Sequence, residues 1–347
     1  MQIKTKLPIN VKMEHLHLFN GKQYYSLRPL KMREIKNVFI THWGLLLKNF
    51  FLPRRSAENL LGNYDQTFYV KHWRIALEQF FVSKFGKSLP SVKLNDEKLY
   101  FSIHTPWFGY FSWLTTYLPR LISVSEKYPN AVLLVPEEWR DLPFVDASLQ
   151  LFDNVEKKVI EHDHHIFVKN YIFCETRPWT SMFYPEHIEQ VRQLFFSAVE
   201  NKENNLEPIK RIYISRKKTN RRKVLNEEVI EKYLFDNDFQ SICFEDYSIF
   251  DQVFLMKNAE IVVSMHGAGM TNGMFMKPNS ILFELSPEIN DHKLFRFPFW
   301  RIASIVDVKY YIQFCESVNG GEDDYYSRNI IVDFQEFKEN MDLVIQQ

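Results

Sequence analysis

The sequence predicts an α/β protein with two domains, each built on a largely parallel sheet, and three observations support this fold class. Short apolar runs rich in β-branched residues alternate with longer amphipathic segments, which is the pattern of βαβ units. A polar break at residues 201–205 separates two such series. The chain has 347 residues, which is enough for two domains with buried cores.

The N-terminal series begins with mixed elements and becomes regular after residue 98. Its clearest buried strand is the apolar run at 131–135, which Pro136 ends. In order, we expect a helix at 65–85, a strand at 98–103, a helix at 111–122, a strand at 131–135, strands at 159–160 and 166–168, and a helix at 185–200.

The C-terminal series repeats the alternation and ends in a helix that Asp333 opens with a capping-box pattern. That helix carries an apolar stripe over residues 334–344. We therefore expect domains at 1–200 and 201–330, and a C-terminal helix within 331–347 that packs back on the N-terminal domain. The expected strands are 211–215, 240–244, 261–264, 281–285 and 309–314, with helices at 226–234 and 249–257.

Composition and charge exclude several classes of protein. The formal net charge is zero, so no overall charge attracts nucleic acid or an anionic membrane. The 3 cysteines form no CxxC pair, which argues against a disulfide framework or a cysteine zinc site. No signal-peptide core occurs, nor an apolar run near the roughly 18 residues of a membrane span, so we expect a cytoplasmic protein. Residues 39–55 could touch a membrane surface, or could form a strand, a turn at Gly44 and a second core strand.

A glycine-rich turn follows the expected strand at 261–264, within Gly267-Ala268-Gly269-Met270-Thr271-Asn272-Gly273. A strand, a glycine turn and a helix start together expose backbone N–H groups at a positive helix end, where phosphate binds well. The turn is not a P-loop, and Asn272 stands where the dinucleotide motif GxGxxG has its third glycine. Glu284 ends the next strand, where an acid commonly binds ribose. The pattern predicts a phosphate near a ribose, or a tight turn with no ligand.

A basic segment follows the expected strand at 211–215 and reads Arg216-Lys217-Lys218-Thr219-Asn220-Arg221-Arg222-Lys223. Arginine binds phosphate oxygens with a planar, two-pronged donor. A solvated loop or a nucleic-acid patch would have the same composition. Because ligands of parallel α/β sheets bind at the carboxyl ends of strands, we expect this segment and the glycine turn to converge on a pyrophosphate.

Two other motifs have the composition of metal sites without suitable spacing. The DxD sequence Asp236-Asn237-Asp238 lies between a helix and a strand instead of at the end of a strand. In His162-Asp163-His164-His165, neighbouring side chains of an extended chain would point to opposite faces. We therefore expect no metal site.

The C-terminal series is similar to the glycosyltransferase family 61 domain over about residues 205–290, in both order and spacing. Upstream, Trp107 and the run at 110–121 resemble that family's helix ending in Leu-Pro-Arg-Leu. The C-terminal resemblance is carried by residues 211–216, Arg222, Asn226, Glu227, Glu245, Gln252, residues 266–269, Thr271, Asn272 and Glu284.

The resemblance implies a GT-B architecture, in which two Rossmann-like α/β domains face a central cleft and the C-terminal one binds a nucleotide sugar. It also implies inverting transfer, most often from a UDP-sugar, with no obligate metal or cofactor. Arg216 and Arg222 would neutralise the leaving diphosphate. His266 would bond a phosphate or the sugar, and Glu284 the ribose or base. The implied donor-binding residues are Arg216, Arg222, Glu245, His266, Gly267, Ala268, Gly269, Thr271, Asn272 and Glu284.

The chain departs from the family at the catalytic base. Where the family has His-Trp-x-x-Asp/Glu before Leu-Pro-Arg-Leu, Ser112 and Thr116 replace the histidine and the acid. An inverting transferase needs a base for the acceptor's proton, which a hydroxyl of ordinary pKa cannot supply. His104, at the end of an expected strand, is the substitute candidate; an unmarked acid or an inactive protein are the alternatives.

These features predict a cytoplasmic bacterial glycosyltransferase that moves a hexose or pentose from a nucleotide sugar to a glycan or lipid-linked glycan. The product would be a surface polysaccharide such as capsule or O-antigen, and the enzyme could sit peripherally on the inner face of the cell membrane. We expect no nucleic-acid partner, and the oligomeric state stays open. One alternative is an NAD-dependent oxidoreductase, which the basic segment disfavours. The other is a non-catalytic nucleotide-sugar-binding protein, which Ser112 and Thr116 favour.

Overall fold

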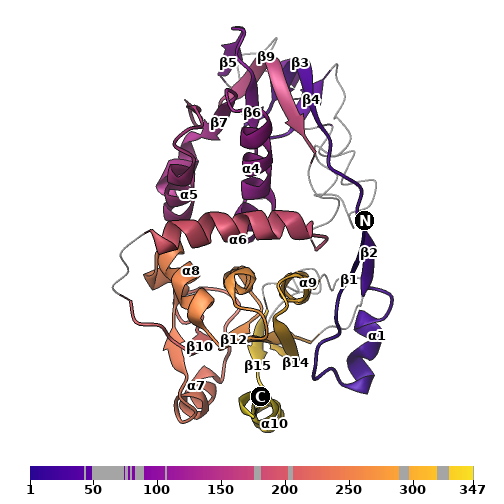
Figure 1. Cartoon of the computed structure of the whole chain (residues 1–347), viewed down its shortest axis with the longest axis vertical. Coiled ribbons are helices and arrows are strands. Elements are labelled where there is room, and N and C mark those ends of the chain that lie inside the picture. The colour runs from indigo at the N-terminus through magenta and orange to yellow at the C-terminus, as the bar shows by residue number, and fades with distance from the viewer. Residues whose placement is uncertain are drawn as a thin grey trace. The chain divides into compact units, whose positions relative to one another are not determined.

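The chain divides into two compact units, which Figure 1 traces in a computed structural model. The first unit is Leu27–Val191, and the second unit combines Met1–Ser26 with Arg192–Gln347. Most of the helix expected at 65–85 lies outside the described residues, as do Trp107 and residues 202–205. The structure describes residues 1–42, 44–48, 74, 77–78, 80–82, 90–105, 108–175, 181–201, 206–288, 297–318 and 328–346.

The second unit is built on a sheet with the strand order β11-β10-β12-β13-β14-β15. The strands run parallel from β11 to β14, and β15 pairs antiparallel with β14. All the strands expected in this half are confirmed. The strands are β10 (Arg211–Ile214), β11 (Gln240–Ile242), β12 (Ile261–Met265), β13 (Ile281–Pro287), β14 (Lys309–Val318) and β15 (Asn329–Ile331).

The C-terminal helix α10 packs on this same sheet (Figure 1). Its apolar stripe of Phe337, Met341 and Val344 joins a core cluster that contains Phe283 of β13 and Tyr311 of β14. The apolar face of the helix therefore completes the core of the second unit, and packing on the expected domain 1–200 stays a prediction. α6 (Pro185–Glu200) is divided between the two units, and the helices after it are α7 (Glu227–Phe235), α8 (Ile249–Asn258), the 3₁₀ helix η7 (Ala268–Phe275), α9 (Pro298–Ile305) and α10 (Phe334–Ile345).

The first 26 residues belong to the second unit. They form an antiparallel pair of β1 (Gln2–Lys4) and β2 (Tyr24–Ser26), with α1 (Leu16–Phe19) between them. Phe19 packs edge-on against Trp300 of α9, with ring centroids 5.1 Å apart. Asn10 donates to the Ile312 carbonyl over 2.9 Å and to the Asn340 side chain over 2.8 Å. The domain expected at 1–200 thus differs from the first unit at both ends.

The division near the other end falls inside α6, at Val191–Arg192, and not at the polar break. The latter part of α6 is tied to the second unit, since Arg192 donates to the Met276 carbonyl over 3.1 Å. Phe195 also packs edge-on against Phe275 of η7, with centroids 5.5 Å apart. The two compact units therefore divide before α6 ends at Glu200, whereas residues 202–205 lie outside the described residues.

The first unit contains a mixed sheet, with the order β4-β3-β9-β6-β7-β8 and β5 beside β9. β6, β7 and β8 are parallel, whereas β3 runs antiparallel to both β4 and β9. Gly44 turns the chain from β3 to β4 with φ of 80°, which confirms the strand–turn–strand interpretation over residues 39–48. The strands are β3 (Met32–Ile40), β4 (Leu46–Lys48), β5 (Ser91–Leu94), β6 (Tyr100–Ser102), β7 (Val132–Pro136), β8 (Lys157–Ile160) and β9 (His165–Cys174).

The helix expected at 111–122 is longer and less regular than a single α-helix. It begins as α3 (Tyr110–Ser112), widens into a π-helical segment (Trp113–Tyr117) and continues as α4 (Leu118–Lys127). Inside the π-helical segment, the Thr115 hydroxyl donates to the Phe111 carbonyl over 2.6 Å. α5 (Pro143–Leu149) follows β7.

Candidate functional site

The glycine turn lies at the carboxyl end of β12, a strand that is buried along its whole length. Gly267 has an extended backbone with φ of 178°, so glycine is not required there by backbone strain. It is required by space, because a Cβ at this position would lie 2.3 Å from Nη1 of Arg216. The absence of a side chain at Gly267 therefore lets a guanidinium lie directly on the turn.

Arg216 reaches the turn because β10 and β12 are neighbours in the sheet. Ile214 of β10 pairs with Ser264 of β12, so both strands end at the same edge. The loop after β10 then curls around the guanidinium. Nε of Arg216 donates to the Arg222 carbonyl over 2.8 Å, and Nη2 donates to the Arg221 carbonyl over 3.4 Å. The structure thus brings Arg216 and Gly267 together as the sequence predicts, while binding of a pyrophosphate there stays a prediction.

Arg222 contributes its backbone to this arrangement. It adopts a left-handed conformation with φ of 59°, which turns its carbonyl toward Nε of Arg216. Its side chain is half-buried. The direct phosphate contact expected of Arg222 is therefore a proposal that rests on its place in the loop.

Acidic side chains also surround Arg216. Burial lowers the pKa of Arg216, while the carboxylates of Glu245 and Glu227 act in the opposite direction. Glu227 is buried and accepts from the Tyr213 hydroxyl over 2.9 Å and from the Arg216 backbone over 3.4 Å. Glu245 is exposed in a 3₁₀ turn (Phe244–Asp246). The guanidinium is thus a half-buried cation next to carboxylates.

Two lysines of the basic segment, Lys217 and Lys218, pair with carboxylates outside the segment. Lys217 pairs with Glu231, and Lys218 pairs with Asp246. Both ammonium side chains are about half exposed. The charges of these two lysines are therefore matched by carboxylates, and Arg216 is the cation of the segment that lies on the turn.

The rest of the glycine turn is a short, tightly packed 3₁₀ helix. A Cβ at Gly269 would lie 3.2 Å from Cδ2 of Phe244, so this glycine allows close packing on the neighbouring turn. Thr271 and Asn272 are fully buried, and the Asn272 amide donates to the Gln252 side chain over 2.8 Å. These two side chains lie within the fold, so a contact from this helix to a ligand would come from the backbone of Ala268 and Gly269.

Glu284 is buried inside the fold and has two side-chain partners. It is only 2% exposed, and its expected contact with a ribose or base stays a prediction. Its Oε1 lies 2.5 Å from Nδ1 of His266, and its Oε2 accepts from the Tyr310 hydroxyl. The sequence analysis did not identify Tyr310. Its contact with Glu284 depends on the register between β13 and β14, which the sequence does not show. Glu284 is thus a buried partner of His266, which itself directly precedes Gly267.

His104 belongs to the first unit and has the surroundings of a packing residue. It is 6% exposed, and its ring lies edge-on to Trp139 with centroids 5.8 Å apart. A Cβ at Gly44 would lie 2.5 Å from its Cδ2. Burial, together with the charge of Arg120, lowers the pKa of His104 to about 3. So weak and so enclosed an imidazole does not support the role of catalytic base.

Arg120, from the Leu-Pro-Arg-Leu sequence, is a structural residue in this unit. It is 7% exposed and donates to the carbonyls of Ile103 over 2.9 Å, Ser102 over 3.2 Å and Cys174 over 3.3 Å. These carbonyls lie at the carboxyl ends of β6 and β9, where the sheet no longer satisfies them. The motif therefore fixes the strand ends of the first unit.

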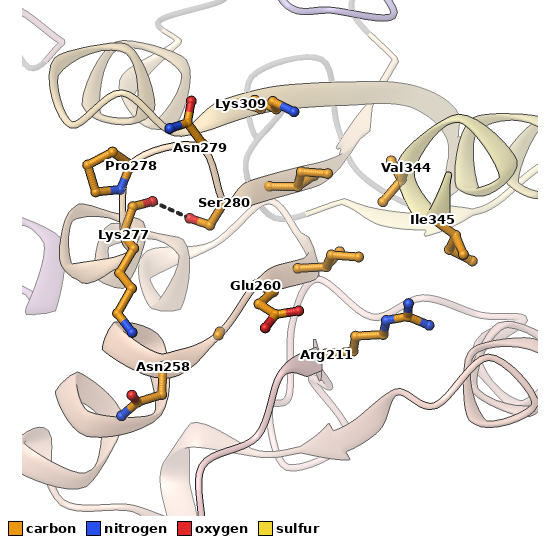
Figure 2. Close-up of a pocket in the computed structure, with 13 residues that line it drawn as sticks. Arg211, Asn258, Glu260, Lys277, Pro278, Asn279, Ser280, Lys309, Val344 and Ile345 are labelled. Atoms are coloured by element: carbon orange, nitrogen blue, oxygen red, sulfur yellow. Dashed lines mark hydrogen bonds between the residues drawn. The ribbon is translucent and has the colours of Figure 1, made fainter. Parts of the chain in front are cut away.

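A pocket of 370 Å³ lies at the amino ends of the parallel strands of the second unit's sheet (Figure 2). Its lining includes the residues that begin β10, β12, β13 and β14, namely Arg211, Ile261, Ile281 and Lys309. Glu260 in the pocket is already paired with Lys210 over 2.7 Å. Because the turn with Arg216 is at the carboxyl ends of these strands, this pocket is separate from the candidate site.

The two metal-like motifs form no coordination site among the residues that the structure describes, where no cluster of three or more His, Cys, Asp or Glu could hold a metal ion. Residues of both motifs have exposed side chains. In the histidine motif, the side chains of His162 and Asp163 are 66% and 47% exposed. Asp238 lies in the turn after α7 and has a left-handed backbone with φ of 65°. Its side chain is 94% exposed.

A model of one protein family, described as Glycosyltransferase 61, matches residues 110–283, which is half of the chain. The match covers α3 and α4 of the first unit and ends at residue 283, within β13 of the second, so it includes Arg216, the glycine turn and His266. No curated protein matches the chain. Within the described residues, no helix has the length and apolar character that crossing a membrane requires.

Proposed function

The chain belongs to glycosyltransferase family 61 and is a glycosyltransferase, and we propose that its donor is a nucleotide sugar whose diphosphate binds beside Arg216 on the Gly267 turn. A UDP-sugar is the proposed donor. The proposed acceptor is a glycan or lipid-linked glycan of a bacterial surface polysaccharide, bound on the first unit of a cytoplasmic, GT-B-type enzyme.

The observation that carries this proposal is the approach of Arg216 to Gly267. A guanidinium is a two-pronged donor for phosphate oxygens, and backbone N–H groups at the start of η7 supply further donors. Both lie at the carboxyl ends of adjacent parallel strands, where α/β sheets bind nucleotides. Because its pairing with carbonyls holds the guanidinium in place, little reorganisation would accompany donor binding.

The proposed reaction is a single displacement with inversion. The acceptor oxygen attacks the anomeric carbon, the bond from that carbon to the diphosphate oxygen breaks, and the hydroxyl proton leaves to a base. Negative charge grows on the departing nucleoside diphosphate. Arg216 and the η7 amides would stabilise this charge, and no metal is needed for that step in this proposal.

A thermal-shift screen against UDP, GDP, CMP, TDP and UDP-sugars tests the donor class. At 100 times Kd a ligand adds about 2.7 kcal/mol to the free energy of unfolding, which corresponds to a shift of several degrees. We expect UDP compounds to give the largest shift. NAD is included, because a response to NAD alone would favour an oxidoreductase and contradict the proposal.

The variant Arg216→Ala tests the site itself, with Arg211→Ala as its matched control. Both arginines flank β10, but Arg211 begins the strand at the pocket edge and Arg216 follows its other end. We expect R216A to lose the UDP shift and R211A to retain it. Equal responses of the two variants would rule out Arg216 as the diphosphate ligand.

A second candidate function, a non-catalytic nucleotide-sugar-binding protein, is favoured by the enclosed His104 and by Ser112 and Thr116 in place of the family's histidine and acid. It predicts the same UDP shift but no transfer and no UDP-sugar hydrolysis. Release of UDP from UDP-sugars, measured with and without glycan acceptor extracts, separates the two candidates.

A further inference from the structure

A chain of three polar side chains crosses the sheet of the second unit directly behind the glycine turn. His266 Nδ1 lies 2.5 Å from Glu284 Oε1, and the Tyr310 hydroxyl donates to Glu284 Oε2. His266 is 8% exposed, Glu284 2% and Tyr310 4%. A carboxylate so deeply buried is stable only where hydrogen bonds satisfy it, and here each of its oxygens has a partner.

Strand register explains why these residues meet. Glu284 is paired with Ser264 of β12 and with Ile312 of β14. His266 lies two residues beyond Ser264, and Tyr310 two residues before Ile312. Since side chains alternate between faces with a period of two, all three point to the same face of the sheet from three adjacent strands.

The contact to Glu284 fixes which ring nitrogen of His266 carries a proton. A carboxylate only accepts hydrogen bonds, so Nδ1 must be the donor and carry hydrogen. A histidine side chain in water prefers the other tautomer, with hydrogen on Nε2. The ring of His266 also packs on Phe299 of α9, with centroids 5.0 Å apart, so both its tautomer and its orientation are held.

We propose that Glu284 and Tyr310 are positioning residues, which act on the donor through His266 and do not touch it themselves. This inference rests on the proposed function, because His266 adjoins Gly267, on which the Arg216 guanidinium lies. Tyr310 holds the carboxylate, and the carboxylate holds the imidazole with hydrogen on Nδ1. Nε2 is then an acceptor, oriented for one hydrogen bond from a hydroxyl of the donor's ribose or sugar. In this proposal Glu284 bonds His266 and Tyr310 instead of the ribose that its place in the sequence suggests.

A double-mutant cycle on UDP binding distinguishes positioning from direct contact. Glu284→Gln should weaken UDP binding roughly 2- to 10-fold, since the His266 hydrogen bond that it would misorient joins neutral groups and is worth about 0.5–1.5 kcal/mol. In a His266→Ala background the same change should have almost no further effect, because its path to the ligand is gone. If E284Q weakens UDP binding equally in both backgrounds, Glu284 contacts the nucleotide directly and the proposal is overturned.

Nitrogen-15 NMR of histidine-labelled protein without ligand supplies a readout that does not depend on UDP. The wild type should show His266 with hydrogen on Nδ1, and E284Q should show a mixture of tautomers. Glu284→Asp, which keeps the carboxylate, should restore part of the Nδ1–H signal. A His266 signal with hydrogen on Nε2 in the wild type would contradict the proposal, even if UDP binds well.

Tyr310→Phe keeps the charge of Glu284 and removes one hydrogen bond to it, so it covers the case in which E284Q does not fold. We expect Y310F to weaken UDP binding roughly 2- to 10-fold, in line with about 0.5–1.5 kcal/mol for one hydrogen bond. Unchanged binding and an unchanged His266 signal in Y310F would remove Tyr310 from the proposal. If the wild type binds no UDP, the proposed function fails, whereas the NMR signal of His266 still decides whether Glu284 positions it.

Discussion

The variant Gly267→Ala, which adds one methyl group, should weaken UDP binding while leaving the stability of the fold nearly unchanged. In Gly267→Ala the new Cβ would lie 2.3 Å from Nη1 of Arg216, well inside the contact distance of about 3.5 Å for two nonbonded heavy atoms. The backbone at Gly267 is extended, with φ of 178°, and alanine adopts it without strain. The guanidinium therefore has to move by about 1 Å or more, while the turn itself can stay in place.

The size of the effect follows from what Arg216 loses. Nη1 is the far end of a flexible side chain, so its displacement should change the free energy of unfolding by less than about 1 kcal/mol, the worth of the bond from Nε of Arg216 to the Arg222 carbonyl. A displaced guanidinium no longer meets the diphosphate, which removes a charge-assisted hydrogen bond of about 1.5–3 kcal/mol. Affinity for UDP should fall roughly 10- to 150-fold.

The assay is UDP titration by calorimetry, with urea unfolding as the measure of stability. Gly109→Ala is the matched control, because Gly109 is also extended, with φ of 166°, and a Cβ there would meet nothing within 4 Å. The double variant G267A/R216A should bind no more weakly than R216A, since both changes remove the same contact. Wild-type affinity in a folded G267A protein would refute the assignment of Arg216 as the diphosphate ligand.

Three further predictions concern stability and metals. Burial lowers the pKa of His104 to about 3 from its ordinary value of 6.5, so the unfolded chain binds a proton at this histidine at a higher pH than the folded chain does. The free energy of unfolding should therefore fall by up to about 1.4 kcal/mol per pH unit as the pH drops from 6.5 toward 3. Urea melts should show that His104→Asn flattens this slope. His165, whose pKa burial lowers to about 4, acts in the same direction, so part of the slope should persist. Arg120→Met should lower the free energy of unfolding by about 3 kcal/mol or more, because three buried carbonyls lose their donor, and a wild-type urea midpoint would contradict this role. Sugar transfer should survive treatment with EDTA; loss of transfer that Mg²⁺ or Mn²⁺ restores would disprove the proposed metal-independent step.

Local sequence patterns were sufficient for much of the second unit. Apolar runs such as 261–264 and 281–285 are short and bounded by turn residues, so they predict buried strands whatever the rest of the chain does. The meeting of Arg216 with the glycine turn also follows, because parallel strands of one sheet end at one edge. The mixed sheet of the first unit did not follow, since the antiparallel run of β3 depends on its pairing with the distant β9.

Predictions of ligand-binding residues from the sequence were misleading where the side chain packs against or pairs with residues from another part of the chain. Lys217 and Lys218 look like diphosphate ligands in sequence, yet Glu231 of α7 and Asp246 of the next 3₁₀ turn bind them. His104 looks like a base at a strand end, but Gly44 and Trp139 enclose it. The partners of the two lysines lie 14 and 28 residues away, those of His104 lie farther still, and no local pattern indicates them.

The sequence by itself determined the family, the order of strands and helices in the C-terminal half, and the two segments that adjoin the candidate donor site, because these depend on residue type and short spacing. Only the tertiary structure decided that residues 1–26 complete the second unit, that α10 packs on its own sheet, and that Glu284 faces His266 and Tyr310. The physical reason is that register and long-range packing choose among many apolar and polar partners of similar local character, and that choice minimises the free energy of the whole unit, not of any one segment.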